Sequence, residues 1–197
     1  MKLMIADTGV ANLASVRFAF ARLGVEALVS ADPQVLAQAD RLILPGVGAA
    51  SAGMKALQDN GLNELLIGFQ RPLLGICLGM QLLFTHSAEA NTSCLGRLSG
   101  QVFALPSSAG PVPHMGWNSL QISKDDPFLA GVETGSYVYF VHSFAAAISS
   151  YTLASSCYGR GFSAVVSQDN VYACQFHPER SGATGSRILQ NFLEVKP

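Results

Sequence analysis

The stretch Pro72-Leu73-Leu74-Gly75-Ile76-Cys77-Leu78-Gly79 runs from an apolar strand through a turn into a helix, with one cysteine between two glycines. A strand of this kind is typical of a parallel sheet that helices cover on both faces. Gly-x-nucleophile-x-Gly at such a turn is the pattern of the nucleophile elbow, where the helix N-terminus favours a thiolate. The pattern predicts Cys77 as nucleophile and the N–H of Leu78 as an oxyanion donor. The alternative is a buried structural cysteine.

Strand and helix patterns alternate on both sides of this stretch. Apolar residues at helical spacing fill residues 11–23, and Gly24 ends that pattern. The predicted strands are residues 3–6, 27–29, 41–44 and 72–76, and the predicted helices are residues 11–23, further stretches up to about residue 69, and residues 79 to about 84. Strands separated by helices imply right-handed crossovers and a parallel sheet.

The second half of the chain changes to short strand-like runs with turn residues between them. These runs are residues 101–104, 119–122, 137–141, 151–157, 162–166 and 171–176. Gln168-Asp169-Asn170 is a hairpin signal, residues 91–100 and 106–113 have loop composition, and residues 183–193 predict a last helix. We therefore predict one domain, residues 1–197, of the α/β class: an open, mostly parallel sheet flanked by helices, with appended antiparallel strands.

The composition limits the classes of function. Hydrophobic residues make up 49% of the chain and charged residues 13%, against about 25% charged in a typical domain. A covered parallel sheet explains this alone, and an apolar surface that a partner covers is the second interpretation. The net charge is −1 with no basic stripe, which argues against nucleic acid as a partner. No apolar run approaches the roughly 20 residues of a membrane span, and the first residues do not resemble a signal peptide, so we expect a cytoplasmic protein.

The four cysteines predict neither disulfides nor a metal site. They are Cys77, Cys94, Cys157 and Cys174. None forms a Cys-x-x-Cys pair and no histidine stands at zinc-finger spacing from them. We expect the three cysteines other than Cys77 to be small buried hydrophobic residues, and the sequence indicates no metal or organic cofactor.

A cysteine nucleophile needs a base and a group that orients the base. The stretch Gln175-Phe176-His177-Pro178-Glu179 follows a predicted strand and offers both. Residues two apart in an extended segment point to the same side, so His177 and Glu179 are predicted to face one site. The other histidines rank lower. We expect His86 at the exposed end of a helix, His114 in a turn, and His142 on a strand that could pass near the site.

A glycine-rich turn supplies a candidate second half of the oxyanion hole. Pro45-Gly46-Val47-Gly48 follows the third predicted strand, at the edge where open α/β sheets bind ligands. Such a turn can aim backbone N–H groups at an oxyanion. The alternative is an ordinary strand-to-helix turn.

Together these stretches resemble the three signatures of class I glutamine amidotransferases. Two further stretches, Asp7-Thr8-Gly9-Val10-Ala11-Asn12-Leu13 and Pro113-His114-Met115-Gly116-Trp117-Asn118, resemble the glutaminase subunits of imidazole glycerol phosphate synthases within that family. The resemblance spans nearly the whole chain. It implies that Cys77 attacks the side-chain amide of glutamine, that His177 protonates the departing ammonia, and that Glu179 orients His177.

The resemblance also implies roles for residues around this triad. Val47 and Leu78 would supply backbone N–H groups to the oxyanion, Val47 after a flip of its peptide. The implied glutamine-binding residues are Gly48, Gln81, Glu89, Ser143 and Phe144. The implied partner is a (β/α)8-barrel cyclase that receives the ammonia in histidine biosynthesis, and Asn12, Met115 and Trp117 would lie near the docking face. The alternatives are a glutaminase of another pathway, such as vitamin B6 or aminobenzoate synthesis, and a silent scaffold that only binds a partner.

Overall fold

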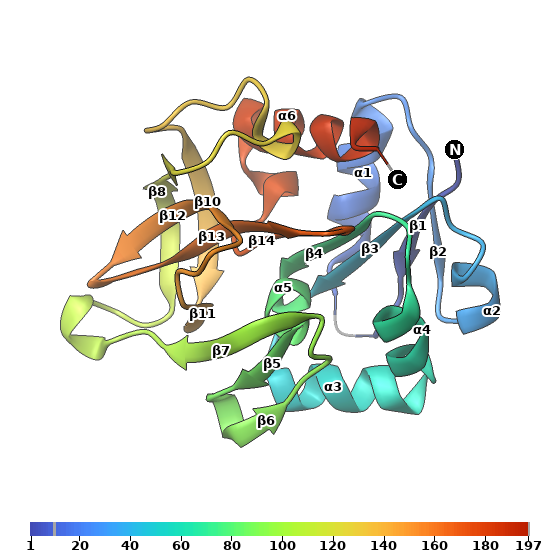
Figure 1. Ribbon diagram of the computed structural model, residues 1–197, viewed down its shortest axis with the longest axis horizontal. Helices are drawn as coiled ribbons and strands as arrows, with labels where there is room; N and C mark the ends of the chain where they lie inside the picture. Colours follow the sequence, from blue (N-terminus) through green and yellow to red (C-terminus); the bar gives the residue numbers. More distant parts are fainter. Residues whose placement is uncertain (10, 197) are drawn as a thin grey trace.

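An eight-stranded sheet runs through the middle of the molecule (Figure 1). The computed structural model describes residues 1–9 and 11–196; Val10 and Pro197, which fall within the predicted domain, lie outside the described residues. The strand order is β2-β1-β3-β4-β14-β13-β12-β9, and the first five strands are parallel while the rest are antiparallel. These strands are β1 (Leu3–Ala6), β2 (Ala27–Ser30), β3 (Arg41–Gly46), β4 (Leu73–Cys77), β9 (Gln121–Ile122), β12 (Thr152–Tyr158), β13 (Arg160–Gln168) and β14 (Val171–Cys174).

Helices cover both faces of the parallel part. The helices are α1 (Leu13–Arg22), α2 (Pro33–Leu36), α3 (Ala50–Asp59), α4 (Leu62–Gly68), α5 (Leu78–Leu82) and α6 (Gly182–Glu194). Successive residues of β1 point to opposite faces, so Leu3 joins the core under α1 and α6, whereas Met4 joins the core under α2 to α5. Strands β1, β3 and β4 are buried on both faces, as the apolar composition predicts, whereas Leu28 and Val29 of the edge strand β2 are exposed.

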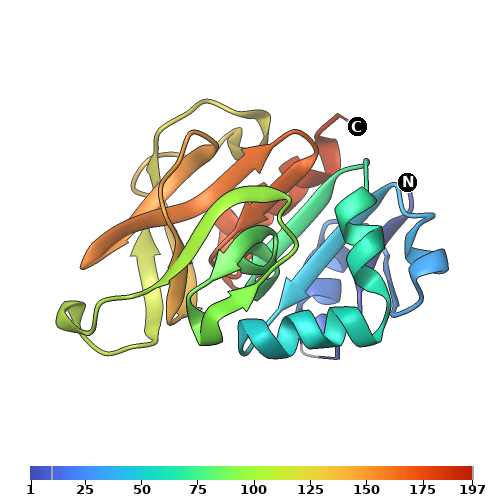
Figure 2. The ribbon, with the colours of Figure 1, turned by 60° about the horizontal axis from the view of Figure 1, so that its bottom comes forward.

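Two smaller sheets complete the fold. Strands β8 (His114–Ser119) and β10 (Tyr137–His142) form an antiparallel ribbon next to α6. Strands β11 (Phe144–Ala146), β7 (Leu98–Ala104), β5 (Phe84–Ser87) and β6 (Thr92–Ser93) form a four-stranded sheet. Figure 2 shows this sheet on the same face of the molecule as α3 and α4, whose core it shares.

The α/β class, the mostly parallel sheet and the appended antiparallel strands are confirmed. The predicted hairpin is also confirmed, because β13 and β14 pair through Gln168 and Val171, and Asp169 takes φ 53° in the turn. Residues 91–100 are not a loop, since they contain β6 and the start of β7. Their pairing partners in β5 and β11 are tertiary neighbours, which local composition does not reveal.

The prediction that His86 lies at the exposed end of a helix is wrong. Helix α5 stops at Leu82, and His86 lies in β5, half-buried and paired with Ser93. The third strand is also longer than predicted: Pro45 and Gly46 belong to β3, and the turn begins at Val47. Within the part of the chain that the structure describes, no helix combines the length and apolarity needed to cross a bilayer.

Candidate active site

Cys77 stands at the end of β4, where the chain turns sharply into α5. Its backbone takes φ 53° and ψ −109°, a conformation that residues other than glycine rarely adopt. A Cβ at Gly79 would lie 1.8 Å from the carbonyl oxygen of Leu44. A Cβ at Gly75 would lie 2.9 Å from Cα of Met80. Both glycines of the elbow are therefore required by the close approach of α5 to the sheet.

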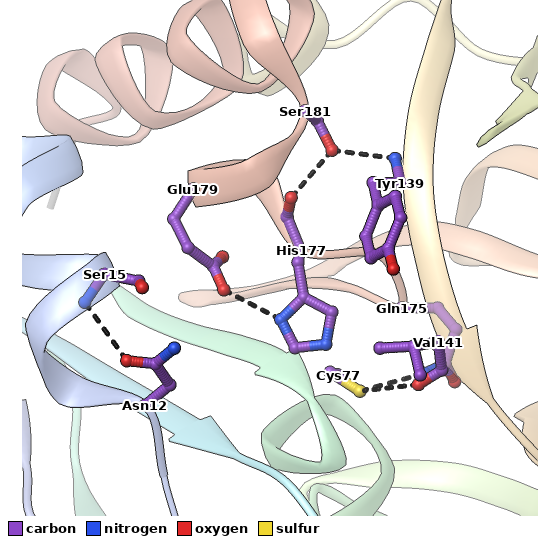
Figure 3. Close-up of polar contacts among 9 residues, drawn as sticks. All are labelled: Asn12, Ser15, Cys77, Tyr139, Val141, Gln175, His177, Glu179 and Ser181. Atoms are coloured by element: carbon purple, nitrogen blue, oxygen red, sulfur yellow. Dashed lines mark hydrogen bonds and ion pairs between the residues drawn. The ribbon is translucent and has the colours of Figure 1, made fainter. Parts of the chain in front are cut away.

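The thiol of Cys77 is held between β10 and the residue that follows β14 (Figure 3). Its Sγ lies 3.8 Å from the carbonyl oxygen of Val141, to which it donates, and 3.8 Å from Nε2 of Gln175, from which it accepts. The residue is only 6% exposed. Gln175 is itself fully buried and accepts a hydrogen bond of 3.0 Å from Nε2 of Gln81. The sulfur thus sits in a fixed polar environment at the base of a cavity.

His177 and Glu179 come together beside Cys77, as predicted. Nδ1 of His177 lies 2.8 Å from Oε1 of Glu179, and their side chains are 7% and 3% exposed. Burial opposes protonation of His177, but the neighbouring Cys77 and Glu179 outweigh it and raise the pKa of the imidazole to about 10. Nε2 of His177 makes no hydrogen bond within the described residues and faces the thiol (Figure 3).

The backbone that brings Glu179 to His177 is not extended, contrary to the sequence-based expectation. Residues Pro178–Arg180 form a 3₁₀ turn with Pro178 as its first residue. Proline suits that position because the first N–H of a helix has no partner in any case. Oγ of Ser181 ties the turn down by donating to the carbonyl oxygen of His177 (2.7 Å) and accepting from the N–H of Tyr139 (2.9 Å).

The sheet itself sets the separation of Cys77 and His177, the predicted nucleophile and base. Strands β4 and β14 are parallel neighbours, with Cys174 opposite Ile76. Cys77 and His177 therefore leave the same edge of the sheet, although they lie far apart in the sequence.

A cavity of about 320 Å³ opens in front of Cys77. Every residue to which the resemblance gives an oxyanion or glutamine-binding role lies in its lining: Val47, Gly48, Leu78, Gln81, Glu89, Ser143 and Phe144. Gly48 takes φ +92°, which only glycine adopts at little cost. Oε2 of Glu89 accepts a hydrogen bond of 2.6 Å from the N–H of Ala50 at the start of α3. The predicted pocket residues are thus gathered around one space large enough for an amino acid.

The residues predicted at a docking face are exposed. Met115 is 64% and Trp117 is 55% exposed on β8, and Trp117 packs edge-on against Tyr139 of β10. Asn12 is exposed and caps α1 by accepting from the N–H of Ser15 at 3.3 Å. Asn12 also lies beside Glu179 in Figure 3, which places it close to the triad.

Gln175 contacts Cys77, but the sequence analysis assigned it no role. It stands at the start of the stretch Gln175-Phe176-His177-Pro178-Glu179. The signal for Gln175 was present, since it stands two residues before His177 at the end of a buried strand. His114 was expected in a turn; instead it is a buried residue of β8, 5% exposed. Its partner strand β10 lies well downstream in the chain, so local sequence could not place it.

The other cysteines differ from one another. Cys174 is fully buried, and burial raises its pKa well above the usual range. Cys94 is half-buried, and burial raises its pKa to about 11. Cys157 is exposed, so the expectation that all three are buried is wrong for this residue. Among residues 1–9 and 11–196, no group of three His, Cys, Asp or Glu side chains could hold a metal ion.

The model of the family "Glutamine amidotransferase class-I" matches residues 5–195. The chain therefore belongs to the class-I glutamine amidotransferases. It shares their fold: a solved structure described as a glutamine amidotransferase superimposes with a TM-score of 0.77 at 21% identity, covering 98% of both chains. The structure of PurLQS from Thermotoga maritima superimposes with a TM-score of 0.73 at 21% identity, covering 98% of this chain and 99% of the other.

More similar relatives carry one particular name within the family. Imidazole glycerol phosphate synthase subunit HisH of Mannheimia succiniciproducens is 48% identical over 192 residues, 98% of this chain and 99% of that protein. The proteins of the same name from Vibrio cholerae and Idiomarina loihiensis are 49% and 50% identical, covering 98% and 99% of this chain and 98% of each relative.

Proposed function

We propose that this chain is the glutaminase subunit of an imidazole glycerol phosphate synthase. It hydrolyses glutamine to glutamate and ammonia and passes the ammonia to a cyclase subunit, which forms imidazole glycerol phosphate and aminoimidazole carboxamide ribotide in histidine biosynthesis. The observation that carries the proposal is the buried Cys77, His177 and Glu179 at a cavity of about 320 Å³, in a chain that matches HisH subunits along nearly its full length.

The geometry supports a two-stage hydrolysis. The Cys77 thiolate attacks the side-chain carbonyl carbon of glutamine, and the negative charge that develops on oxygen is stabilised by backbone N–H groups of Leu78 and Val47. Protonated His177 gives its proton to the departing nitrogen, which leaves as ammonia, and a thioester to Cys77 remains. The now neutral His177 removes a proton from water, which attacks the thioester and releases glutamate and the thiolate. Glu179 fixes the orientation of His177 and stabilises its charged form throughout.

The oxyanion turn offers a means of control. Val47 is 41% exposed, and the peptide that carries its N–H joins it to Gly46, whose backbone no side chain restricts, so this peptide can turn over. We propose that glutamine hydrolysis is slow in the free chain and rises when the cyclase and its nucleotide ligand bind, because this peptide then turns its N–H into the site. Equal ammonia release with and without the liganded cyclase would contradict this coupling.

The proposed partner is a (β/α)8-barrel cyclase that docks on the exposed face of the β8–β10 ribbon. Strand register places Trp117 beside Tyr139 and Met115 beside Val141, and Tyr137 of the same face is 60% exposed. Aromatic residues and Met are enriched in protein interfaces. The face adjoins the triad, because the N–H of His177 donates to the carbonyl oxygen of Tyr139 at 3.0 Å. We place the pair in the cytoplasm, and the four free cysteines suit a reducing compartment.

The decisive experiment measures glutamate and ammonia release by the wild type, Cys77→Ala and Cys157→Ala. Each protein is tested alone, with the cyclase, and with the cyclase plus its nucleotide substrate. We expect release that requires the liganded cyclase, that Cys77→Ala abolishes, and that the exposed-cysteine control Cys157→Ala preserves. Cys77→Ala should still bind the cyclase. Activity with the partner of another amidotransferase, and none with the cyclase, would assign the chain to another pathway.

A further inference from the structure

Two buried histidines form a hydrogen-bonded pair behind the glutamine pocket. His114 of β8 and His142 of β10 are directly opposite each other in the ribbon, and each is 5% exposed. Nδ1 of His114 lies 3.0 Å from Nε2 of His142. His142 also lines the cavity in front of Cys77, whereas His114 does not reach it. The catalytic steps proposed above use neither residue.

The surrounding groups determine which nitrogen carries the proton. Nδ1 of His142 lies 2.8 Å from the carbonyl oxygen of Phe144, which can only accept, so this nitrogen is the donor. Burial lowers the pKa of His142 to about 4, which leaves its ring neutral and its Nε2 an acceptor. His114 must then donate from its own Nδ1, and its Nε2 faces the side-chain amide of Asn118 at 3.4 Å. Both rings are thus in the Nδ1–H form.

The carbonyl oxygen of Phe144 is where this pair meets the glutamine pocket. It accepts from His142 and also from Nε2 of Gln81 at 2.8 Å. The two bonds hold the bend at Ser143, and Ser143 and Phe144 form one wall of the cavity. If His142 took the other tautomer, its unprotonated Nδ1 would face the oxygen of Phe144, and two acceptors would repel each other. The N–H of His114 disfavours that tautomer, because it donates a hydrogen bond to Nε2 of His142, which must then be unprotonated.

The packing around His114 can be separated from its hydrogen bond. Its ring stacks on Tyr158 at 4.3 Å between centroids and on Phe140 at 5.1 Å. A phenylalanine in its place keeps an aromatic ring in the stack and removes the donor. An asparagine loses the stack but keeps an N–H at the position of the imidazole Nδ1. His114→Phe therefore tests the hydrogen bond, and His114→Asn tests the stacking.

We propose that His114 and His142 are positioning residues for glutamine: His114 and the carbonyl of Phe144 together fix the tautomer of His142, and His142 holds the Ser143–Phe144 wall in the shape that binds the substrate. This inference rests on the proposed function, because it takes glutamine as the occupant of the cavity. It predicts that His114, which does not reach the cavity, controls the affinity for glutamine through the hydrogen bond from its Nδ1–H to His142.

The experiment compares His114→Phe and His114→Asn in the Cys77→Ala background, which binds glutamine without turning it over. Calorimetry gives the dissociation constant of glutamine for each protein. Losing one neutral hydrogen bond is expected to weaken glutamine binding about 3- to 10-fold in His114→Phe, while His114→Asn stays within about 2-fold of its parent. Weaker binding in His114→Asn than in His114→Phe would show that only the stacking matters and would overturn the proposal.

A second measurement does not depend on glutamine. Nitrogen NMR of protein labelled in its histidine rings distinguishes the two tautomers of each ring. His114 and His142 should both show the Nδ1–H form in the parent, and His142 should become a mixture in His114→Phe. An Nε2–H form of His142 in the parent would refute the pair. No glutamine binding by the parent, with the tautomers as expected, would instead count against the proposed function.

Discussion

Replacing Cys77 by glycine should make the protein more stable than replacing it by alanine. Cys77 holds φ 53° and ψ −109°, and alanine must keep that backbone with its Cβ in place, whereas glycine adopts it freely. Both variants lose the thiol and its two contacts of 3.8 Å, so their difference is confined to the backbone and the Cβ atom. The comparison measures how much strain the elbow stores at the nucleophile.

The magnitude follows from two opposing contributions. A residue in such a sparsely populated region costs about 1–3 kcal/mol. Glycine loses roughly 0.5–1 kcal/mol relative to alanine in an ordinary strand, through the entropy of the unfolded chain. Taking about 2 kcal/mol of strain against about 1 kcal/mol of entropy leaves Cys77→Gly more stable by about 1 kcal/mol. For a chain of this size that corresponds to about 2–4 °C in Tm.

Urea unfolding and thermal melts of the two variants provide the assay. Ala173→Gly is the matched control, since Ala173 is fully buried in the neighbouring strand β14, next to Gly75, and is not a positive-φ residue. There glycine should lower stability, by roughly 0.5–1 kcal/mol from chain entropy alone. If Cys77→Gly proved no more stable than Cys77→Ala while the control behaved as expected, the elbow would store no strain and the reasoning would fail.

Three further predictions concern the triad and the core. The raised pKa of His177 stabilises the folded protein fully below about pH 6.5, and this contribution is lost as the pH rises through about 10. Glu179→Gln should lower the pKa of His177 and reduce the loss of unfolding free energy between about pH 6 and about pH 9. NMR titration of His177 and urea unfolding at the two pH values measure these effects, and an unchanged pKa would contradict the pairing of His177 with Glu179. Ammonia release should suffer less from Glu179→Gln than from His177→Ala, because orienting a base contributes less than being one, and the reverse ranking in steady-state assays would exchange their roles. Arg41→Met should lower the free energy of unfolding in urea by about 2 kcal/mol. The buried guanidinium donates to two backbone carbonyls at the end of α6, and these would lose their partner. A decrease under about 0.5 kcal/mol would show that water replaces the guanidinium.

The sequence predicted the parallel core and the triad because both depend on local signals. An apolar strand before Cys77 and a carboxylate two residues after His177 are visible in a few residues. Two of the predictions that failed concern histidines whose place depends on pairing with other strands. His86 continued an apparent helix in sequence, but its segment pairs with β6 and β7. His114 has no local strand pattern of its own and is fixed by β10.

The position of β14 beside β4 has a consequence for how such a protein can change over time. Cys77 and His177, the proposed nucleophile and base, leave neighbouring strands of one sheet. The pocket wall at Ser143 and the exposed ribbon with Trp117 belong to the long insertion between them in the sequence. If the proposed docking face is correct, substitutions in that insertion alter partner recognition without shifting Cys77 relative to His177. Natural selection can therefore redirect the ammonia to a new acceptor while the chemistry that liberates it is inherited unaltered.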